Sequence, residues 1–212
     1  TAARVVDRVL LPPGDPAWLA RWQQQADTTP QEPHELTGQT VAAEVVAAAR
    51  PGENLVFGAS SSIRYADLAP INPNPGFCWA NRGLTGIDGT VATATGIALV
   101  TGAPTTLLLG DLTLQHDLGA LAPPEVGHEA RLRVILLDDH GGTIFASLEQ
   151  GQPAFAAAFD RVFRASQGVE LGSVVHSLGW RTAEVTCIQS LRQMLARPSS
   201  DRELLHIVLG QD

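Results

Sequence analysis

The chain has 212 residues and a formal net charge of −8, and all 14 of its basic residues are arginines. The negative charge argues against nucleic acid or an anionic membrane as the main partner. The lack of lysine excludes Schiff-base chemistry, a P-loop lysine and a Ser-Lys pair, whereas arginine is well suited to holding carboxylates and phosphates. A chain of this length is long enough for one large α/β domain.

The cysteines and the chain ends indicate where the protein works and how it is organised. Cys78 and Cys187 lack the spacing of a zinc site or a disulfide framework, so a reducing, cytoplasmic setting is expected. No apolar run approaches the length of a membrane span, and no signal-peptide pattern opens the chain. Residues 1–16 end in a proline-rich stretch typical of a linker. We expect a C-terminal piece of a longer protein, with a connector at residues 1–16 and one domain at residues 17–212.

Short apolar runs alternate with helix-like segments along the chain. Helical patterns are predicted at residues 17–25, 39–49, 89–101, 169–178 and 190–196. Runs typical of buried parallel strands are predicted at residues 54–57, 77–80, 106–109, 134–137, 182–185 and 204–209. This alternation predicts an α/β fold with a doubly wound, mostly parallel sheet and helices on both faces. In such sheets, ligands bind beyond the carboxyl ends of the strands.

Two of the predicted strands are followed by turns that indicate ligand binding. The strand at residues 54–57 leads through small residues to Ser60 and then to a helix that carries Arg64. A turn of this kind favours an anion, although an N-cap serine with a surface arginine is the alternative. The loop at residues 81–89 reads NRGLTGIDG, and its three glycines and Arg82 predict close approach to a ligand. A purely structural turn is the alternative there.

Two further strands each end in acid and glycine. Asp111 follows Gly110 after the strand at residues 106–109, and Asp139 lies 28 residues later in the turn DDHGG after residues 134–137. Neighbouring parallel strands would bring both carboxylates to one rim, where they would repel each other unless a cation lay between them. Hard oxygen ligands select Mg²⁺ or Ca²⁺, and Mg²⁺ completes its shell from a phosphate. The alternative is that these acids only cap strands and start helices.

These residues carry a resemblance to a known family. Gly-Asp followed by an Asn- or Asp-rich turn resembles the thiamine-diphosphate motif. Within the thiamine-diphosphate-dependent superfamily, the stretches GDLT, NRGLTGIDG and DDHGGTIF are most similar to the SEPHCHC synthases of menaquinone biosynthesis. That family commonly has asparagines where Asp138, Asp139 and His140 stand, so the metal would meet an extra carboxylate here. Aspartate offers the same oxygen ligand with more charge. The resemblance covers essentially the whole chain and implies the diphosphate-binding domain of a three-domain enzyme.

The resemblance also implies a set of site residues. The implied cofactor is thiamine diphosphate with Mg²⁺, or Mn²⁺ in its place. The implied metal ligands are Asp111, Asp139 and the Gly141 carbonyl. The implied cofactor contacts come from Ser60, Ile87, Gly110, Asp111, Leu112 and Gly141, among which the isoleucine would keep the thiamine bent. The implied substrate contacts come from two carboxylate-binding arginines and two apolar residues, namely Arg64, Arg82, Ile144 and Phe145. For the phenylalanine, packing on the core is the alternative.

The resemblance implies an activity on small-molecule substrates. The cofactor would decarboxylate 2-oxoglutarate, and the resulting carbanion would add to isochorismate. In the family, the glutamate that activates the cofactor lies in the N-terminal domain of a neighbouring subunit. The resemblance therefore implies that the missing N-terminal and central domains complete the enzyme. It further implies that the protein is at least a homodimer, or a tetramer, and that this chain alone is inactive.

Three other functions remain open from the sequence. The chain could belong to another thiamine-diphosphate enzyme, such as an acetolactate synthase or a 2-oxoacid decarboxylase. It could be a Mg²⁺-dependent phosphohydrolase that uses Asp111, Asp138 and Asp139. It could also be a non-catalytic α/β binding or assembly module. Activity with isochorismate rather than pyruvate would separate the first, and phosphate release without thiamine would identify the second.

Overall fold

A computed structural model describes residues 14–26, 35–122, 125, 127–199 and 202–210. The chain divides into two units, Thr1–Pro33 and His34–Asp212. The predicted connector at residues 1–16 lies almost entirely outside the described residues, and Pro16 already belongs to a helix. That helix, α1 (Pro16–Ala26), exposes the side chains of Trp18 and Trp22, whose ring centroids are 5.8 Å apart. The predicted domain boundary at residue 17 stays a prediction.

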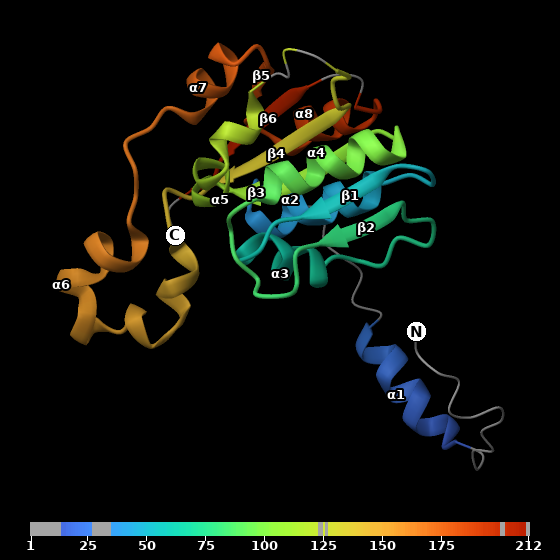
Figure 1. The fold of residues 1–212 in the computed structure, drawn as a ribbon. Coiled ribbons are helices and arrows are strands. Elements are labelled where there is room, and N and C mark those ends of the chain that lie inside the picture. The colour runs from blue at the N-terminus through green and yellow to red at the C-terminus, as the bar shows by residue number, and fades with distance from the viewer. Residues whose placement is uncertain (1–13, 27–34, 123–124, 126, 200–201, 211–212) are drawn as a thin grey trace. The chain divides into compact units, whose positions relative to one another are not determined.

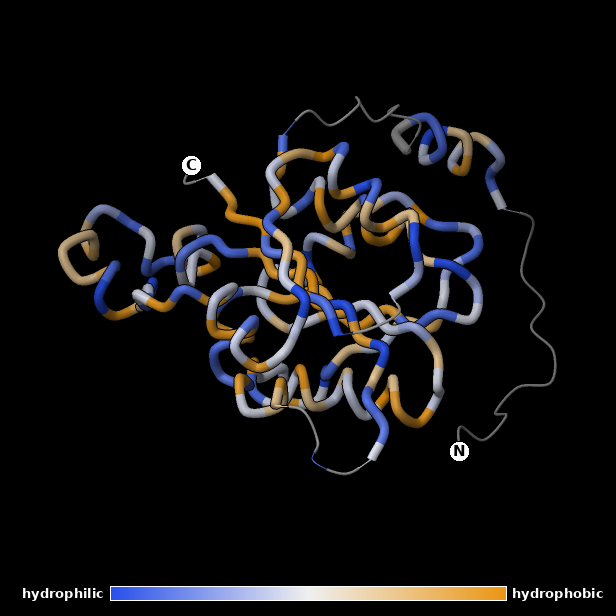
Figure 2. Tube along the Cα trace, turned by 90° about the horizontal axis from the view of Figure 1, so that it is seen from above, coloured by the Kyte–Doolittle hydropathy of each residue, from blue (hydrophilic) through white to orange (hydrophobic). Residues whose placement is uncertain are grey.

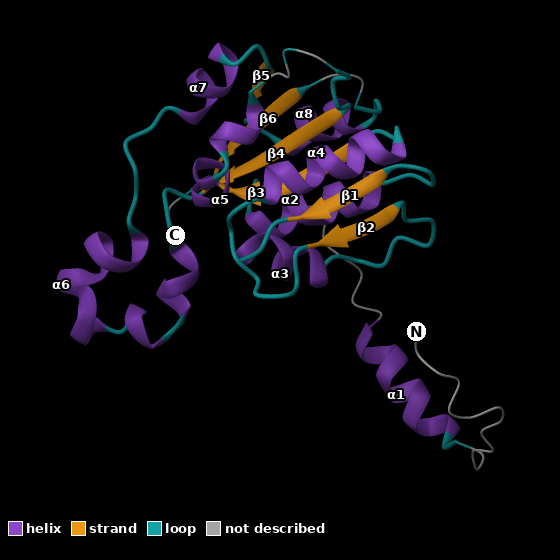
Figure 3. Cartoon of the chain, in the orientation of Figure 1, coloured by secondary structure: helices purple, strands orange, loops and turns teal. Residues whose placement is uncertain are grey.

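The second unit is built on a six-stranded parallel sheet (Figures 1 and 3). All of its neighbouring strands pair in parallel, in the order β2-β1-β3-β4-β6-β5. The strands are β1 (Asn54–Phe57), β2 (Phe77–Ala80), β3 (Thr105–Gly110), β4 (Leu132–Asp138), β5 (Arg181–Glu184) and β6 (Glu203–Val208). Each coincides with a predicted strand to within two residues at either end. The prediction of a doubly wound, parallel α/β sheet is confirmed.

Helices cover both faces of this sheet because its central strands bury side chains on both sides. In β3, Leu107 and Leu109 pack on one face, while Leu108 packs on the other. Helices α4 (Thr90–Thr101), α5 (Asp111–His116) and α7 (Leu171–Ser177) cover the first face, together with the turn Leu118–Leu121. Helices α2 (Gly38–Ala48), α3 (Ser61–Asp67) and α8 (Ile188–Leu195) cover the second. Figure 2 shows the apolar strands, in orange, between these two layers.

The order of the strands creates a crevice at one place in the sheet. From β1 the chain moves outward to β2, and it then returns past β1 to β3 on the other side. The connections that follow neighbouring strands β1 and β3 therefore diverge, which leaves room between their carboxyl ends. Such a switch point is where open α/β sheets bind ligands.

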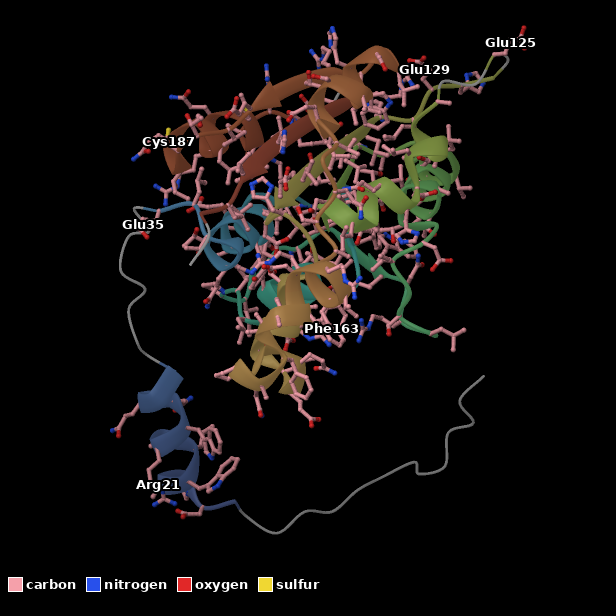
Figure 4. All side chains as sticks on the ribbon, turned by 90° about the vertical axis from the view of Figure 1, so that its left-hand side faces the viewer. Arg21, Glu35, Glu125, Glu129, Phe163 and Cys187 are labelled. Carbon is pink, nitrogen blue, oxygen red and sulfur yellow. The ribbon has the colours of Figure 1, made fainter. Side chains whose placement is uncertain are left out.

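A segment of short helical turns follows β4 and returns to it. It comprises Thr143–Ser147, Glu149–Gly151, Pro153–Phe155, α6 (Ala156–Phe159) and a π-helical turn, Asp160–Arg164. Figure 1 shows this segment extending away from the sheet, and Figure 4, in which Phe163 is labelled, shows it from its outer side. The rings of Phe145 and Phe163 lie 5.8 Å apart, and Gly142 N–H donates to the Arg164 carbonyl at 2.7 Å. These contacts join both ends of the segment beside the sheet.

Among the described helices, none is long and apolar enough to cross a membrane. Both cysteines, Cys78 and Cys187, are exposed and free, and Cys187 is labelled in Figure 4.

Candidate functional site

A cavity of about 140 Å³ lies at the carboxyl ends of the strands. Its walls come from the residues that follow β1, β2, β3, β4 and β6, so the switch point of the sheet forms its centre. Most of the predicted site residues line it, namely Ser60, Ile87, Gly110, Asp111, Leu112, Asp139, Gly141, Ile144 and Phe145. Residues spread over 86 positions of the sequence are thus brought to one place by the parallel pairing of the strands.

Asp111 reaches the wall of this cavity because β3 ends at Gly110 and α5 begins immediately after it. Its side chain is buried, and its Oδ1 accepts a hydrogen bond from Leu112 N–H at 2.8 Å. Burial, together with the nearby charges of Asp139 and Asp138, raises the pKa of Asp111 from 3.8 to about 6, against the lowering effect of the Leu112 and Gly141 N–H groups. The carboxylate is therefore held in a site where its negative charge is costly.

Asp139 faces the same cavity from the turn after β4. Its carboxylate accepts a hydrogen bond from the Thr143 hydroxyl. Burial raises the pKa of Asp139 despite this hydrogen bond, and the neighbouring charge of Asp138 raises it as well. Two desolvated carboxylates on adjacent strand ends repel each other, and a cation between them would remove that repulsion.

Asp138, the acid next to it, points elsewhere because side chains alternate across a strand. Its Oδ2 lies 2.8 Å from His206 Nε2 on β6, and its Oδ1 accepts from His140 N–H at 3.2 Å. Asp138 is therefore engaged away from the Asp111–Asp139 pair. Within the described part of the chain, no group of three or more His, Cys, Asp and Glu side chains is placed to hold a metal. The three-carboxylate phosphohydrolase site is not formed in this arrangement.

The turn that presents Asp139 has an unusual backbone. His140 has φ 60° and Gly141 has φ 121°, both in the left-handed region. A Cβ added at Gly141 would collide with the carbonyl oxygen of Arg164, so glycine is required there both for its conformation and for its lack of a side chain. The turn therefore lies against the segment that returns from Arg164.

Gly141→Ala should consequently destabilise the protein by about 1–3 kcal/mol, the usual cost of a strained backbone position. Thermal and urea unfolding of the two proteins measure the difference. Gly119→Ala is a matched control because an added Cβ there would meet no atom within 4 Å and φ is not positive. Equal stability of Gly141→Ala and the parent chain would show that the turn is not held as described.

Ser60 enters the cavity from the turn after β1. Its φ of 70° and ψ of −135° are rare for a residue other than glycine, and such strain concentrates at functional sites. It occupies the N-cap position of α3, yet its side chain makes no capping hydrogen bond to any described residue. The alternative of an ordinary N-cap serine is therefore not what the structure shows. Arg64 Nη1 instead donates to the Ser60 carbonyl at 2.6 Å.

The two predicted arginines do not share the cavity with the other site residues. Arg64 and Arg82 are exposed, and neither contributes to the lining within the described part of the chain. Ile87, in the same loop as Arg82, does reach the cavity and is half-buried. The substrate-binding roles of both arginines stay predictions.

Several lining residues were missed by sequence reasoning. Tyr65, Thr113, Thr143 and Leu209 also form the wall. Thr143 could have been found from the sequence, since it follows Asp139 by four residues, a spacing at which its hydroxyl can donate to that carboxylate. Nothing in the sequence indicated Leu209, because only the pairing of β6 with β4 brings the end of the chain to the cavity.

The donor set fits a divalent cation that carries a phosphate. Asp111 and Asp139 offer hard carboxylate oxygens, and the positive-φ turn at Gly141 lies in the same wall. The cavity is smaller than the roughly 300–1,000 Å³ of a typical ligand pocket. It therefore suits the cation and the phosphate end of a larger ligand.

The fold and the site define the class of this protein. It is a doubly wound, parallel α/β domain with a buried pair of carboxylates at the switch point of its sheet. Comparison with known proteins identifies its family, although no protein-family model matches the chain. It is 42% identical to the 2-succinyl-5-enolpyruvyl-6-hydroxy-3-cyclohexene-1-carboxylate synthase of Renibacterium salmoninarum, over 92% of this chain and 36% of that protein.

Two other relatives carry the same name. The synthase of Kineococcus radiotolerans is 38% identical over 100% of this chain and 40% of its own length. That of Mycobacterium sp. strain KMS is 42% identical over 76% of this chain and 31% of its own length. The chain belongs to the family of these synthases, abbreviated SEPHCHC synthases, and it spans about a third of the length of the relatives it matches.

Proposed function

We propose that this chain is the cofactor-binding domain of a SEPHCHC synthase that depends on thiamine diphosphate and Mg²⁺. The observation that carries the proposal is the pairing of Asp111 and Asp139 in one cavity with Ser60, Ile87 and Ile144, in a chain at least 38% identical to three synthases of this name. The proposed reaction decarboxylates 2-oxoglutarate and joins the product to isochorismate.

The residues of this chain would have separate tasks in that reaction. Asp111, Asp139 and the Gly141 carbonyl would hold Mg²⁺, and Mn²⁺ would serve in its place. Ser60, Gly110 and Leu112 would position the diphosphate, because they line the same wall as the acids. The bound thiamine would supply the stabilisation of the carbanion that forms on loss of CO₂.

The apolar lining and the arginines would act on the rest of the ligands. Ile87, Ile144 and Phe145 form half-buried apolar walls that would exclude water from the thiamine and the substrate. Arg64 and Arg82 would bind substrate carboxylates from outside the cavity.

We further propose that this domain requires the rest of a synthase to catalyse the reaction. The described lining of the cavity contains no glutamate, the residue type that activates the cofactor in the resembled family. The chain also spans only 31–40% of the relatives described above. The 212-residue chain should accordingly bind thiamine diphosphate weakly or not at all and should not consume 2-oxoglutarate. The whole enzyme would then consist of several domains and work in the cytoplasm.

The experiment that tests the function uses the full-length protein with thiamine diphosphate and Mg²⁺. Consumption of 2-oxoglutarate that depends on isochorismate, with no activity on pyruvate, is the expected result. Activity on pyruvate would identify an acetolactate synthase or a decarboxylase instead. Metal-dependent release of phosphate without thiamine would identify a phosphohydrolase, and no activity of any kind would favour a binding module.

We also propose that the full-length protein forms at least a dimer. Helix α4 is apolar on both sides, and it exposes Leu99 and Val100, the latter at 89%. The edge strand β2 exposes Phe77 and Trp79. A helix that is apolar all round is usually buried, so this surface requires a cover from a second copy or from another part of the protein.

Val100→Asp should therefore shift the full-length protein toward the monomer. The expected loss of dimer affinity is about 10-fold or more, because a charge would replace a buried apolar contact. Light scattering coupled to size-exclusion chromatography, over a range of concentrations, measures the change. Gln189→Asp, at an exposed position of α8, is the control. An unchanged dimer in both variants would show that α4 does not form the interface.

A further inference from the structure

His206 does not line the cavity, and it contacts Asp138, which begins the turn that carries Asp139. It stands on β6, two strands away from Asp111, and its ring faces the first turn of α7, where a Cβ at Gly172 would lie 3.4 Å from Nδ1. Its Nε2 lies 2.8 Å from Asp138 Oδ2, and both side chains are largely buried. An aspartate side chain is ordinarily ionised near neutral pH and then only accepts hydrogen bonds, so His206 Nε2–H is the donor in this 2.8 Å contact.

Asp138 accepts three hydrogen bonds that hold the turn at residues 138–141 in place. Its carbonyl accepts from Leu209 N–H at 2.8 Å, its Oδ2 accepts from His206, and its Oδ1 accepts from His140 N–H at 3.2 Å. The last of these hydrogen bonds forms an Asx turn, in which an aspartate side chain accepts from the backbone N–H two residues further on, and it holds the backbone of His140, whose φ is 60°. The positive φ angles at His140 and Gly141 turn the chain directly after Asp139, which lines the same cavity as Asp111.

We propose that His206 is a positioning residue for the cation site: through Asp138, it holds the turn at residues 138–141 so that Asp139 and Gly141 face Asp111. It does not touch the cation. Partners that lie behind metal ligands orient those ligands, and their loss typically weakens metal binding by about 10- to 100-fold. This inference rests on the proposed function, since it concerns the same cation.

The test compares two substitutions at this position in the full-length protein. His206→Leu keeps an apolar side chain of similar size but removes the donor, and His206→Gln keeps an N–H that can reach Asp138. Mn²⁺ binding is measured by calorimetry and by electron paramagnetic resonance at saturating thiamine diphosphate, and no turnover is required. We expect His206→Leu to bind Mn²⁺ about 10-fold more weakly and His206→Gln to bind it within about 3-fold of the parent protein.

Two controls separate positioning from general damage. His176→Leu, on α7, changes a histidine that lines the same surface hollow as His206 and should leave Mn²⁺ affinity unchanged. The melting temperature of each variant is measured without metal, so that a loss of fold is recognised. If His206→Leu unfolds, rescue of both fold and Mn²⁺ affinity by His206→Gln still supports the donor role.

The possible outcomes differ in what they overturn. Equal Mn²⁺ affinity of His206→Leu and the parent protein would overturn the positioning role while leaving the proposed function intact. Equal losses in the Leu and Gln variants would show that the hydrogen bond is not the cause. No Mn²⁺ binding by the parent protein with thiamine diphosphate would overturn the proposed function, and this inference with it.

Discussion

Asp111→Ala should abolish cofactor binding by the full-length protein and reduce its activity to background. Asp111 is the most buried carboxylate of the cavity and the one that follows β3 at the switch point. Loss of a direct metal ligand should exceed the effect of losing a partner behind one, so we expect Mn²⁺ affinity to fall by at least about 100-fold. Calorimetric titration of Mn²⁺ and thiamine diphosphate measures the loss separately from turnover.

Asp67→Asn provides the matched control for this substitution. Asp67 ends α3 at an exposed position outside the cavity, so the variant removes one negative charge without touching the site. Cofactor affinity should stay unchanged there. If Asp111→Ala kept its Mn²⁺ affinity, the cation would be held elsewhere, and the thiamine assignment of this cavity would be wrong.

The metal-free chain should become less stable as the pH rises from about 4 to about 6. The pKa of Asp111 is raised from 3.8 to about 6 in the folded protein, chiefly by burial, and the pKa of Asp139 is raised as well. Between these two pH values the folded state binds more protons than the unfolded state, so the free energy of unfolding falls with increasing pH. Asp111 alone should account for a loss on the order of 3 kcal/mol, complete about one pH unit above its folded pKa of about 6.

Urea unfolding of the metal-free chain at pH 4.5 and pH 7.5 measures this effect. In Asp111→Asn, the decrease between the two pH values should be smaller by the contribution of Asp111, because the asparagine does not titrate. Other acids also change charge in this range, so the difference between variant and parent is the decisive quantity. A pH dependence that is the same in both proteins would show that the Asp111 carboxylate is not desolvated. In the full-length protein, Mg²⁺ with thiamine diphosphate should restore stability at pH 7.5, since bound ligands favour the folded state.

The fold was largely predictable because the strands of a parallel sheet are buried on both faces. Their apolar runs, such as residues 134–137, stand out from the polar turns around them, and each was placed to within two residues. The pairing of Asp111 with Asp139 was also predictable, because each lies two residues after the end of such a run and β3 and β4 are neighbours. Strand ends of known direction constrain where their side chains lie.

The outer part of the site was less predictable. Arg64 and Arg82 have the expected spacing from Ser60 and within the NRGLTGIDG loop, yet both lie outside the cavity. Arginine has a long, flexible side chain whose charged end remains in water unless a partner holds it. Sequence spacing places the backbone of such a residue and leaves the position of its guanidinium undecided. The anchoring of Asp138 by His206 was invisible for another reason, since 68 residues separate them.

The class of fold, the two acids at one edge of the sheet and the turns that require glycine could all be inferred from the sequence alone. Each of these features can be recognised in a short stretch of sequence, because a buried strand shows as an apolar run and a tight turn shows as a cluster of glycines. Contacts between distant strands were needed to place Asp138 against His206 and to bring Leu209, near the end of the chain, into the wall of the cavity. The pairing of β4 with β6 decided both placements, and it forms only when strands distant in the sequence come together.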